Sequence, residues 1–413
     1  MEVLTDPLID ILEHRRALYR PPARQTVVEW CEANLRLSAR QTEYPGPFST
    51  ALRPYIREPL ECWKDSSVSE VTLCWGSQTA KTTMLMAGFA WLIANDPSPA
   101  LWVMPSKSLA RSFSKTRWQP FLEESPALVA QFPVREDDLT NLEQHFRGCT
   151  LNFIGSNSPA ELSSRPIRIL IADETDKFAS ATDREADALE LAEDRLKAFS
   201  TSKQFLTSTP TLVEGRIWQR FLTGDQRRYW IPCPHCQQYI QLLWKQVRWD
   251  PEAKTAGRQW DYSKVRLSAR YECQLCGGHI TDAQKVTALR HGEWRPENDT
   301  ALPGVRSYHL SSLYSPDRKC TWGQLAVKFL DANESFLGLQ GFINGMLAEP
   351  WENQADRSAR LELVSPSDAP PLPESITFLT ADHQALAPYF WVVAREWDQE
   401  GNSRLRACYM CDD

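Results

Sequence analysis

Between about residue 70 and residue 207, short apolar runs alternate with longer segments in which apolar positions recur with a helical spacing. The apolar runs predict strands at Glu70–Trp75, Ala100–Met104, Leu151–Ile154, Ile167–Ala172 and Gln204–Thr207. The segments between them predict helices at Lys81–Ala94, Lys107–Leu122 and Glu185–Phe199. Because strands that alternate with helices form a parallel sheet covered on both faces, we expect an α/β fold with a mostly parallel sheet.

The pattern changes after this region. Strand-rich sequence with two cysteine pairs extends from Tyr229 to Thr281, and a mixed segment continues to about Trp351. The proline-rich stretch Ser365–Pro373 cannot hold a helix or a central strand, so it predicts a linker. Beyond it, Ile376–Ala381 and Tyr389–Trp397 predict two strands joined by a short loop.

Composition narrows the class of protein. The 413 residues are 42% hydrophobic and 24% charged, which excludes a largely disordered, collagen-like or coiled-coil chain. The net charge of -7 excludes a surface that is basic throughout but allows a local basic face. The longest apolar run, Met84–Ala94, is about half of the roughly 20 residues that a membrane span needs. The acidic N-terminus is not typical of a signal peptide, so we expect a cytoplasmic protein without membrane contact.

The segment Val71–Thr83 passes from a predicted strand through a turn into a predicted helix. A phosphate-binding loop has this geometry, because backbone N–H groups and a helix N-terminus then face the anion. We expect an exposed Lys81 to reach the terminal phosphates and Thr82 to hold Mg²⁺. The strict pattern has glycine in place of Trp75 and Ala80, and a chance helix start with Lys-Thr is the alternative. The candidate nucleotide contacts are Gly76, Ser77, Gln78, Thr79, Ala80, Lys81, Thr82 and Thr83.

A second apolar strand ends in two carboxylates, Asp173 and Glu174. In the Walker B arrangement such a strand places Asp beside the magnesium ion and Glu beside the attacking water. A strand that merely ends in acids is the alternative. The pairing with an earlier phosphate loop favours ATP hydrolysis, with Asp173 on Mg²⁺ and Glu174 as the catalytic carboxylate.

A third strand, at Phe205–Thr207, ends in the hydroxyl residues Thr207, Ser208 and Thr209. In motor ATPases such a strand end senses the γ-phosphate and passes the signal to the nucleic-acid site. A Ser/Thr-rich turn is the alternative. We therefore treat these three residues as candidates for coupling.

Four cysteines form two CxxC pairs, Cys233 with Cys236 and Cys273 with Cys276. Four thiolates from two such turns form a closed tetrahedral Zn²⁺ site, which predicts a structural zinc. A redox-active disulfide is the alternative. A third CxxC, Cys408–Cys411, has no partner pair, and we interpret it as coincidence.

Further motifs occur along nearly the whole chain in the order found in one family. They are Val28–Ser38, Pro45–Phe48, Pro54–Glu58, Gln78–Thr82, Phe153–Pro159, Ser164–Pro166, Asp173–Asp176, the cysteine pairs and Gly341–Trp351. With these motifs the chain resembles the lambda-type, GpA-like large subunits of phage DNA-packaging terminases.

The resemblance implies a RecA-type P-loop ATPase that pumps double-stranded DNA into a procapsid. It also implies a small terminase subunit, a capsid portal protein and further copies in a homo-oligomeric ring as partners. Tyr55 becomes a candidate nucleotide contact, and Arg111 and Arg165 become candidates for the arginine finger.

The family also implies an RNase H-like nuclease that uses acidic residues and divalent metal. Asp382, at the end of a predicted strand, is its candidate catalytic carboxylate and metal ligand. The other carboxylates of a two-metal site are not recognisable before Asp413, so we expect little or no cleavage of DNA by this chain.

The expected organisation follows from these assignments. It comprises an N-terminal segment for small-subunit contact (1–50), a P-loop ATPase domain (51–228), an inserted zinc ribbon (229–282), a connecting region (283–352), a linker (353–375) and the start of an RNase H-like domain (376–413).

Two other classes remain as alternatives. A helicase-like DNA-dependent ATPase would need a second RecA-like lobe, and too few residues follow Trp351 for one. A non-enzymatic adaptor that binds DNA or the portal is disfavoured by the presence of Lys81, Asp173 and Glu174.

Overall fold

The computed structural model describes residues 25–39, 42–132, 139–178, 186–255, 259–352, 375–383, 389–400 and 403–412. The chain divides into two compact units, Met1–Trp351 and Glu352–Asp413. The predicted linker Ser365–Pro373 lies outside the described residues. In the part of the chain that is described, no helix is both long and apolar enough to cross a membrane.

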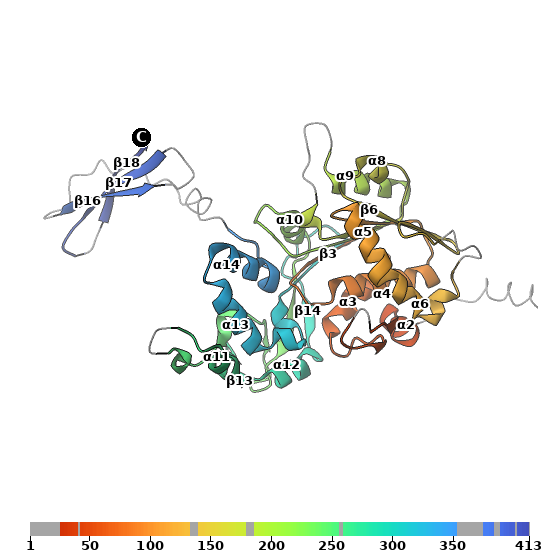
Figure 1. The fold of residues 1–413 in the computed structure, drawn as a ribbon, viewed down its shortest axis with the longest axis horizontal. Coiled ribbons are helices and arrows are strands. Elements are labelled where there is room, and N and C mark those ends of the chain that lie inside the picture. Colours follow the sequence, from red (N-terminus) through yellow and green to blue (C-terminus); the bar gives the residue numbers. More distant parts are fainter. Residues whose placement is uncertain are drawn as a thin grey trace, which may run out of the picture. The chain divides into compact units, whose positions relative to one another are not determined.

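The first unit is built on a ten-stranded sheet with the order β10-β9-β15-β3-β8-β7-β4-β6-β5, and β14 pairs with β9 (Figure 1). Its strands are β3 (Glu70–Trp75), β4 (Ala100–Met104), β5 (Glu143–Phe146), β6 (Cys149–Gly155), β7 (Ile169–Asp173), β8 (Lys203–Ser208), β9 (Arg227–Pro232), β10 (Tyr239–Ile240), β14 (Glu293–Arg295) and β15 (Val305–Leu310). The seven strands from β9 to β6 in this order run parallel, and β10, β14 and β5 pair antiparallel at the edges. The expected mostly parallel α/β sheet is confirmed.

Helices cover both faces of this sheet. They are α2 (Val27–Asn34), α3 (Arg57–Glu61), α4 (Lys81–Asn95), α5 (Lys107–Phe113), α6 (Gln119–Glu123), α7 (Pro126–Val129), α8 (Pro159–Leu162), α9 (Ala188–Glu193) and α10 (Arg216–Thr223). In β7, Ile169 and Ile171 join the core beneath α2 to α7, whereas Leu170 and Ala172 join the core beneath α8 to α10. Because both faces are covered in this way, β4 and β7 are mostly apolar along their whole length.

Two predicted helices are less regular than the sequence indicates. The predicted helix Lys107–Leu122 is present, but α5 passes into α6 through a π-helical turn, η2 (Ser114–Trp118). The predicted helix Glu185–Phe199 is shorter, because α9 gives way to a 3₁₀ turn, η5 (Asp194–Ala198).

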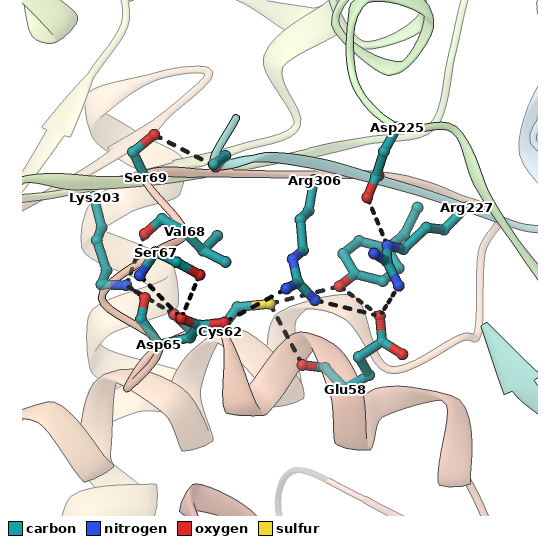
Figure 2. Close-up of polar contacts among 12 residues, drawn as sticks. Glu58, Cys62, Asp65, Ser67, Val68, Ser69, Lys203, Asp225, Arg227 and Arg306 are labelled. Atoms are coloured by element: carbon teal, nitrogen blue, oxygen red, sulfur yellow. Dashed lines mark hydrogen bonds and ion pairs between the residues drawn. The ribbon is translucent and has the colours of Figure 1, made fainter. Parts of the chain in front are cut away.

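Ion pairs and hydrogen bonds connect the N-terminal ends of the parallel strands to α3 and the loop that follows it, as Figure 2 shows. Glu58 of α3 accepts hydrogen bonds from Arg227 at 2.8 Å and from the Tyr308 hydroxyl at 3.0 Å. Lys203, the first residue of β8, donates to the carbonyl oxygens of Cys62, Asp65 and Val68. These contacts fix α3 and the loop before β3. The candidate site lies at the opposite end of the strands, where β3, β7 and β8 terminate.

The cysteine pairs lie in a region with its own small sheet. It consists of β11 (Val247–Arg248), β12 (Arg270–Glu272) and β13 (His279–Ile280), all antiparallel. The helix α11 (Tyr262–Ser268) lies between β11 and β12 in the chain. The helices α12 (Asp282–Leu289), α13 (Trp322–Ala332) and α14 (Phe336–Phe342) come after β13, and α14 ends in a π-helical turn, η10 (Ile343–Leu347). A short hairpin, β1 (Arg36–Leu37) with β2 (Gly46–Pro47), precedes the main sheet.

The second unit contains an antiparallel sheet of β16 (Ile376–His383), β17 (Tyr389–Trp397) and β18 (Ser403–Asp412). The two strands predicted here are present, and β18 is a third that the sequence analysis did not assign. Cys408 and Cys411 both lie in β18.

Candidate nucleotide and metal sites

The loop between β3 and α4 lies where the central strands end. Gln78 and Ala80 have φ angles of 61° and 66°, in the left-handed region that favours glycine. Ala80 occupies the position where the strict phosphate-loop pattern has glycine, so the loop keeps the glycine-like conformation without the glycine. Gly76 is required for another reason, because a Cβ there would lie 2.8 Å from the Met346 carbonyl oxygen and the Ser312 Oγ.

Lys81 is the first residue of α4, and its side chain is buried. The expectation of an exposed lysine is therefore wrong. Its Nζ donates to the carbonyl oxygens of Trp75 at 2.7 Å and Gly76 at 3.3 Å, so the ammonium group folds back onto its own loop. Burial lowers the pKa of Lys81, and the carboxylates of Glu174 and Asp173 oppose this shift.

Asp173 is the last residue of β7 and lies close to the loop. Its Oδ2 accepts a hydrogen bond from the Thr82 hydroxyl at 3.4 Å. Its Oδ1 is buried and has no hydrogen-bond partner among the described residues. Burial, reinforced by the charge of Glu174, raises the pKa of Asp173 to about 6. A hydroxyl and a carboxylate with a spare oxygen are the ligands that Mg²⁺ prefers, so these residues fit the ion.

Glu174 follows directly and has a φ of 62°, a left-handed backbone conformation that is uncommon for residues other than glycine. Strained backbone of this type clusters at functional sites. Its carboxylate forms an ion pair with Lys177 at 3.0 Å. Glu174 also lines the cavity above the loop, where a water molecule could be held.

The hydroxyl residues at the end of β8 lie between the two motifs. In the sheet, Thr207 pairs with Leu73 of β3 on one side and with Asp173 on the other. The Thr207 Oγ1 is buried without a hydrogen-bond partner among the described residues. Ser208 accepts a hydrogen bond from the Asp176 N–H and donates to the carbonyl oxygen of Thr209. The three coupling candidates therefore contact or adjoin the acidic strand end.

A cavity of about 530 Å³ opens over the loop. Its walls are formed by Leu37, Thr42, Glu43, Tyr44, Phe48, Ser49, Arg53, Ile56, the loop residues 76–83, Arg117, Glu174, Asp317 and Lys319. Tyr55 is not among these residues. It is fully buried and packs edge-on against Trp75 at 5.8 Å between ring centroids.

Arg117 is a site residue that the sequence analysis missed. It lies in the π-helical turn η2, lines the cavity and exerts its charge on Asp173. Burial lowers its pKa, although Asp173 opposes the shift. No motif surrounds Arg117, so only the fold identifies it. Of the two arginine-finger candidates, Arg111 is exposed on α5, and Arg165 bonds Glu143 at 2.6 Å. Neither lines this cavity.

The two CxxC pairs are brought together by the strands that carry them. All four Sγ atoms of Cys233, Cys236, Cys273 and Cys276 lie within 4.8 Å of one another, and those of Cys233 and Cys276 are 3.9 Å apart. Zn–S bonds of about 2.3 Å in a tetrahedron place sulfur atoms about 3.8 Å apart. The cluster therefore has the composition and the spacing of a four-thiolate metal site.

Asp382 lies in β16, paired with Trp391 of β17. Its backbone position near the end of the strand agrees with the sequence analysis, and its side chain lies outside the described residues.

The fold and the loop define an α/β protein with a phosphate-loop geometry where its parallel strands end. Comparison with known families identifies it further. The profile described as "Phage terminase large subunit gpA, ATPase domain" matches residues 42–294, and "Terminase large subunit gpA, endonuclease domain" matches residues 305–405. The chain belongs to the gpA family of phage terminase large subunits.

Two curated relatives carry the name "Terminase, large subunit". The one from Enterobacteria phage P21 is 23% identical over 389 residues, and the one from Escherichia phage lambda is 22% identical over 394 residues. These alignments cover 87% and 89% of this chain but only 58% and 59% of the relatives. The chain thus spans less than two thirds of their length.

Solved structures of terminases are more distant. The HK97 bacteriophage large terminase has a TM-score of 0.45 and 11% identity, and the alignment covers 93% of this chain and 66% of that one. The ATPase domain of the Thermus phage P74-26 large terminase has a TM-score of 0.40 and 13% identity, with coverage of 76% and 99%.

Proposed function

We propose that this chain is the ATP-driven motor subunit of a phage DNA-packaging terminase, which hydrolyses ATP to move double-stranded DNA into a procapsid. The observation that carries the proposal is the contact of Thr82 with Asp173, 3.4 Å apart, beside a buried Lys81. Membership of the gpA family supports the same conclusion.

Each residue has a distinct role in this proposal. Lys81 leaves the carbonyl oxygens of its own loop and binds the terminal phosphates, while N–H groups at the end of the loop and the start of α4 face the same anion. Thr82 and Asp173 hold Mg²⁺, which neutralises charge on the phosphates when it is bound with ATP. Glu174 orients and deprotonates the attacking water. Arg117 adds positive charge at the cavity wall, where negative charge develops during hydrolysis.

The hydroxyl residues Thr207, Ser208 and Thr209 are proposed to relay the state of the phosphates. Their strand end adjoins the acidic one, so a shift of Asp173 or Glu174 reaches them directly. A basic inner face of a ring of subunits would contact DNA despite the net acidity of the chain.

The region around the four cysteines is proposed to be a structural zinc ribbon, because the site has no open ligand position. The second unit is proposed to be part of an RNase H-like nuclease domain in which Asp382 binds a divalent metal ion. The proposed partners are the small terminase subunit and the portal protein, in the cytoplasm of the bacterial host.

The experiment that tests the motor proposal is ATP turnover by purified wild-type protein and Lys81→Ala. We expect the variant to lose at least about 100-fold in kcat/KM, because it removes the positive charge that binds the terminal phosphates (an order-of-magnitude expectation for removal of one electrostatic donor). Lys64→Ala is the control, since the Lys64 Nζ donates to the Gln25 carbonyl oxygen and Lys64 is not among the residues that line the cavity. Near-wild-type turnover by Lys81→Ala would refute the phosphate-loop assignment.

A further inference from the structure

The chain after β15 passes against the phosphate loop. The carbonyl oxygen of Leu310, the last residue of β15, accepts a hydrogen bond from the Gly76 N–H at 2.7 Å. The carbonyl oxygen of Gly345, in the turn η10, accepts one from the Ser77 N–H, also at 2.7 Å. Both acceptors lie within residues 305–405, the stretch that matches the endonuclease profile. Residues outside the ATPase match thus contact the loop of the ATPase site.

Two serine hydroxyls in this stretch make the most specific contacts. Ser312, in the 3₁₀ turn η8 (Ser312–Tyr314), donates to the Ser77 carbonyl oxygen at 2.7 Å. Ser315 donates to the Gln78 carbonyl oxygen at 2.8 Å and accepts a hydrogen bond from the Asp317 N–H at 3.3 Å. Both serines are fully buried. A buried hydroxyl is costly without a partner, so each serine and the carbonyl it meets satisfy one another.

These contacts determine which way the loop amides point. A peptide unit is planar and trans, so its N–H points away from its C=O. A carbonyl oxygen of Ser77 held by Ser312 therefore fixes the direction of the Gln78 N–H. In the same way, a Gln78 carbonyl oxygen held by Ser315 fixes the Thr79 N–H. Gln78 is already in a left-handed conformation, which a free loop of non-glycine residues would leave.

We propose that Ser312 and Ser315 are positioning residues for the phosphate loop, which hold its backbone in the form that binds nucleotide. The proposal rests on the proposed function of the loop and extends that function to a segment beyond residues 42–294. Neither serine lines the cavity above the loop. Their effect is on the fraction of the protein in which the loop is ready to bind.

The expected effect follows from that fraction. When a loop loses a restraining hydrogen bond, the apparent dissociation constant rises as the competent fraction falls. The net free energy contributed by one hydrogen bond corresponds to a rise in the apparent dissociation constant of about two- to tenfold for each serine. The turnover number should change less than the affinity, because the groups that contact the phosphates and the water stay in place.

The test compares Ser312→Ala, Ser315→Ala and the double variant with Ser307→Ala. Ser307 is a matched control, because it is also fully buried and its hydroxyl donates to the Phe221 carbonyl oxygen and accepts from the Gln226 N–H. It lies in β15 but contacts no residue of the loop through these bonds. The measurements are the dissociation constant for Mg·ATP, KM and kcat, together with the melting temperature without nucleotide.

We expect all the variants to melt somewhat below the wild type. Only Ser312→Ala and Ser315→Ala should raise the dissociation constant and KM, and the double variant should raise both further. A double variant whose KM matches that of Ser307→Ala would overturn the proposal. If the double variant does not fold, amide hydrogen exchange of residues 77–80 in Ser315→Ala decides the question, since exchange no faster than in Ser307→Ala would also overturn it.

The outcomes separate this inference from the proposed function. Wild-type protein that neither binds nor hydrolyses Mg·ATP would remove the proposed function, and the inference with it. Wild-type protein that does both, with serine variants that behave as the control does, would remove the inference alone.

Discussion

The carboxylates Asp173 and Glu174 are neighbours in the chain but differ in surroundings. Asp173 is almost fully buried at the end of its strand and contacts Thr82. Glu174 has a left-handed backbone conformation and lines the cavity. Burial and the adjacent charge raise the pKa of Asp173 to about 6, and a bound cation would favour its ionised form. The geometry thus gives one carboxylate to the metal and the other to the water.

This separation predicts different outcomes for two substitutions. Glu174→Gln should lower ATP turnover by at least 100-fold while the dissociation constant for Mg·ATP stays within about threefold, because only the group that takes up the proton of the water is removed. Asp173→Asn should weaken Mg·ATP binding itself. Nucleotide affinity measured beside turnover checks both. An equal loss of affinity and turnover in Glu174→Gln would contradict the assignment.

A second residue-scale prediction concerns His309, which is buried in β15 and donates through Nε2 to the Ala348 carbonyl oxygen. Burial, aided by the charge of Arg228, holds the pKa of His309 well below its usual value of 6.5. The unfolded chain therefore takes up a proton below pH 6.5 and the folded chain does not. The free energy of unfolding should fall as the pH decreases below about 6.5, by up to about 1.4 kcal/mol per unit from this group.

His309→Gln keeps a side-chain N–H that can donate to the Ala348 carbonyl oxygen, and it removes the titratable imidazole. We expect its free energy of unfolding to depend less on pH between about 5 and 6.5 than that of the wild type, as measured by denaturant titrations. Glu349, which lines the same small cavity and whose pKa is raised by burial, titrates in both proteins and cancels in the difference. Parallel curves for the two proteins would show that folding leaves the pKa of His309 unchanged, which would contradict this prediction.

At the scale of elements, the sequence identified those parts of the fold whose pattern is local. The strands β3, β4 and β7 are buried and mostly apolar because both their faces are covered, and this makes them visible in the sequence. β15 was not predicted, although it lies beside β3 at the centre of the sheet. Its buried residues include Ser307 and His309, whose polar groups find partners only in the folded chain.

The residues of the candidate site also fall into those that a local sequence motif identifies and those that only the fold brings together. The loop and the acidic strand end carry motifs and were predicted, since their chemistry requires certain residues at short spacing. Arg117, Ser312 and Ser315 reach the site from other elements and have no such signature. Tyr55 shows the opposite case, because the resemblance suggested a nucleotide contact and the residue packs in the core instead.

The cysteine cluster gives a prediction at this scale. We expect one tightly held zinc ion per chain by metal analysis, and loss of both the metal and solubility in Cys233→Ser or Cys276→Ser. Structural zinc contributes directly to the free energy of folding, so the region between Tyr229 and Thr281 should unfold without it. Cys408→Ser is the control, because Cys408 is exposed in β18 and outside the cluster. Protein that is free of metal and normally stable would refute the site.

For the whole molecule, the boundary between the two compact units lies at a different residue from the boundary between the two family matches. The ATPase profile ends at residue 294 and the endonuclease profile begins at residue 305, yet the first compact unit extends to Trp351. It includes β15, which pairs with both β3 and β9. The residues that match the start of the endonuclease profile therefore complete the sheet that carries the nucleotide site.

A chain that ends at residue 351 should consequently fold and hydrolyse ATP, whereas one that ends at residue 294 should not fold. The shorter chain lacks a strand from the centre of the sheet and exposes the edges of β3 and β9. Circular dichroism, melting curves and ATP turnover of the two chains are the measurements. Cooperative melting and turnover by the shorter chain would contradict this division of the molecule.

The place of β15 also bears on how the protein forms during translation. Val305–Leu310 pairs with Glu70–Trp75, so about 230 residues are synthesised after β3 before its partner leaves the ribosome. Until then, one edge of β3 has no strand to pair with, and pairing across such a distance in sequence is slow. The nascent chain should therefore depend on chaperones through most of its synthesis, and the phosphate loop should reach its final shape only when nearly the whole unit has emerged.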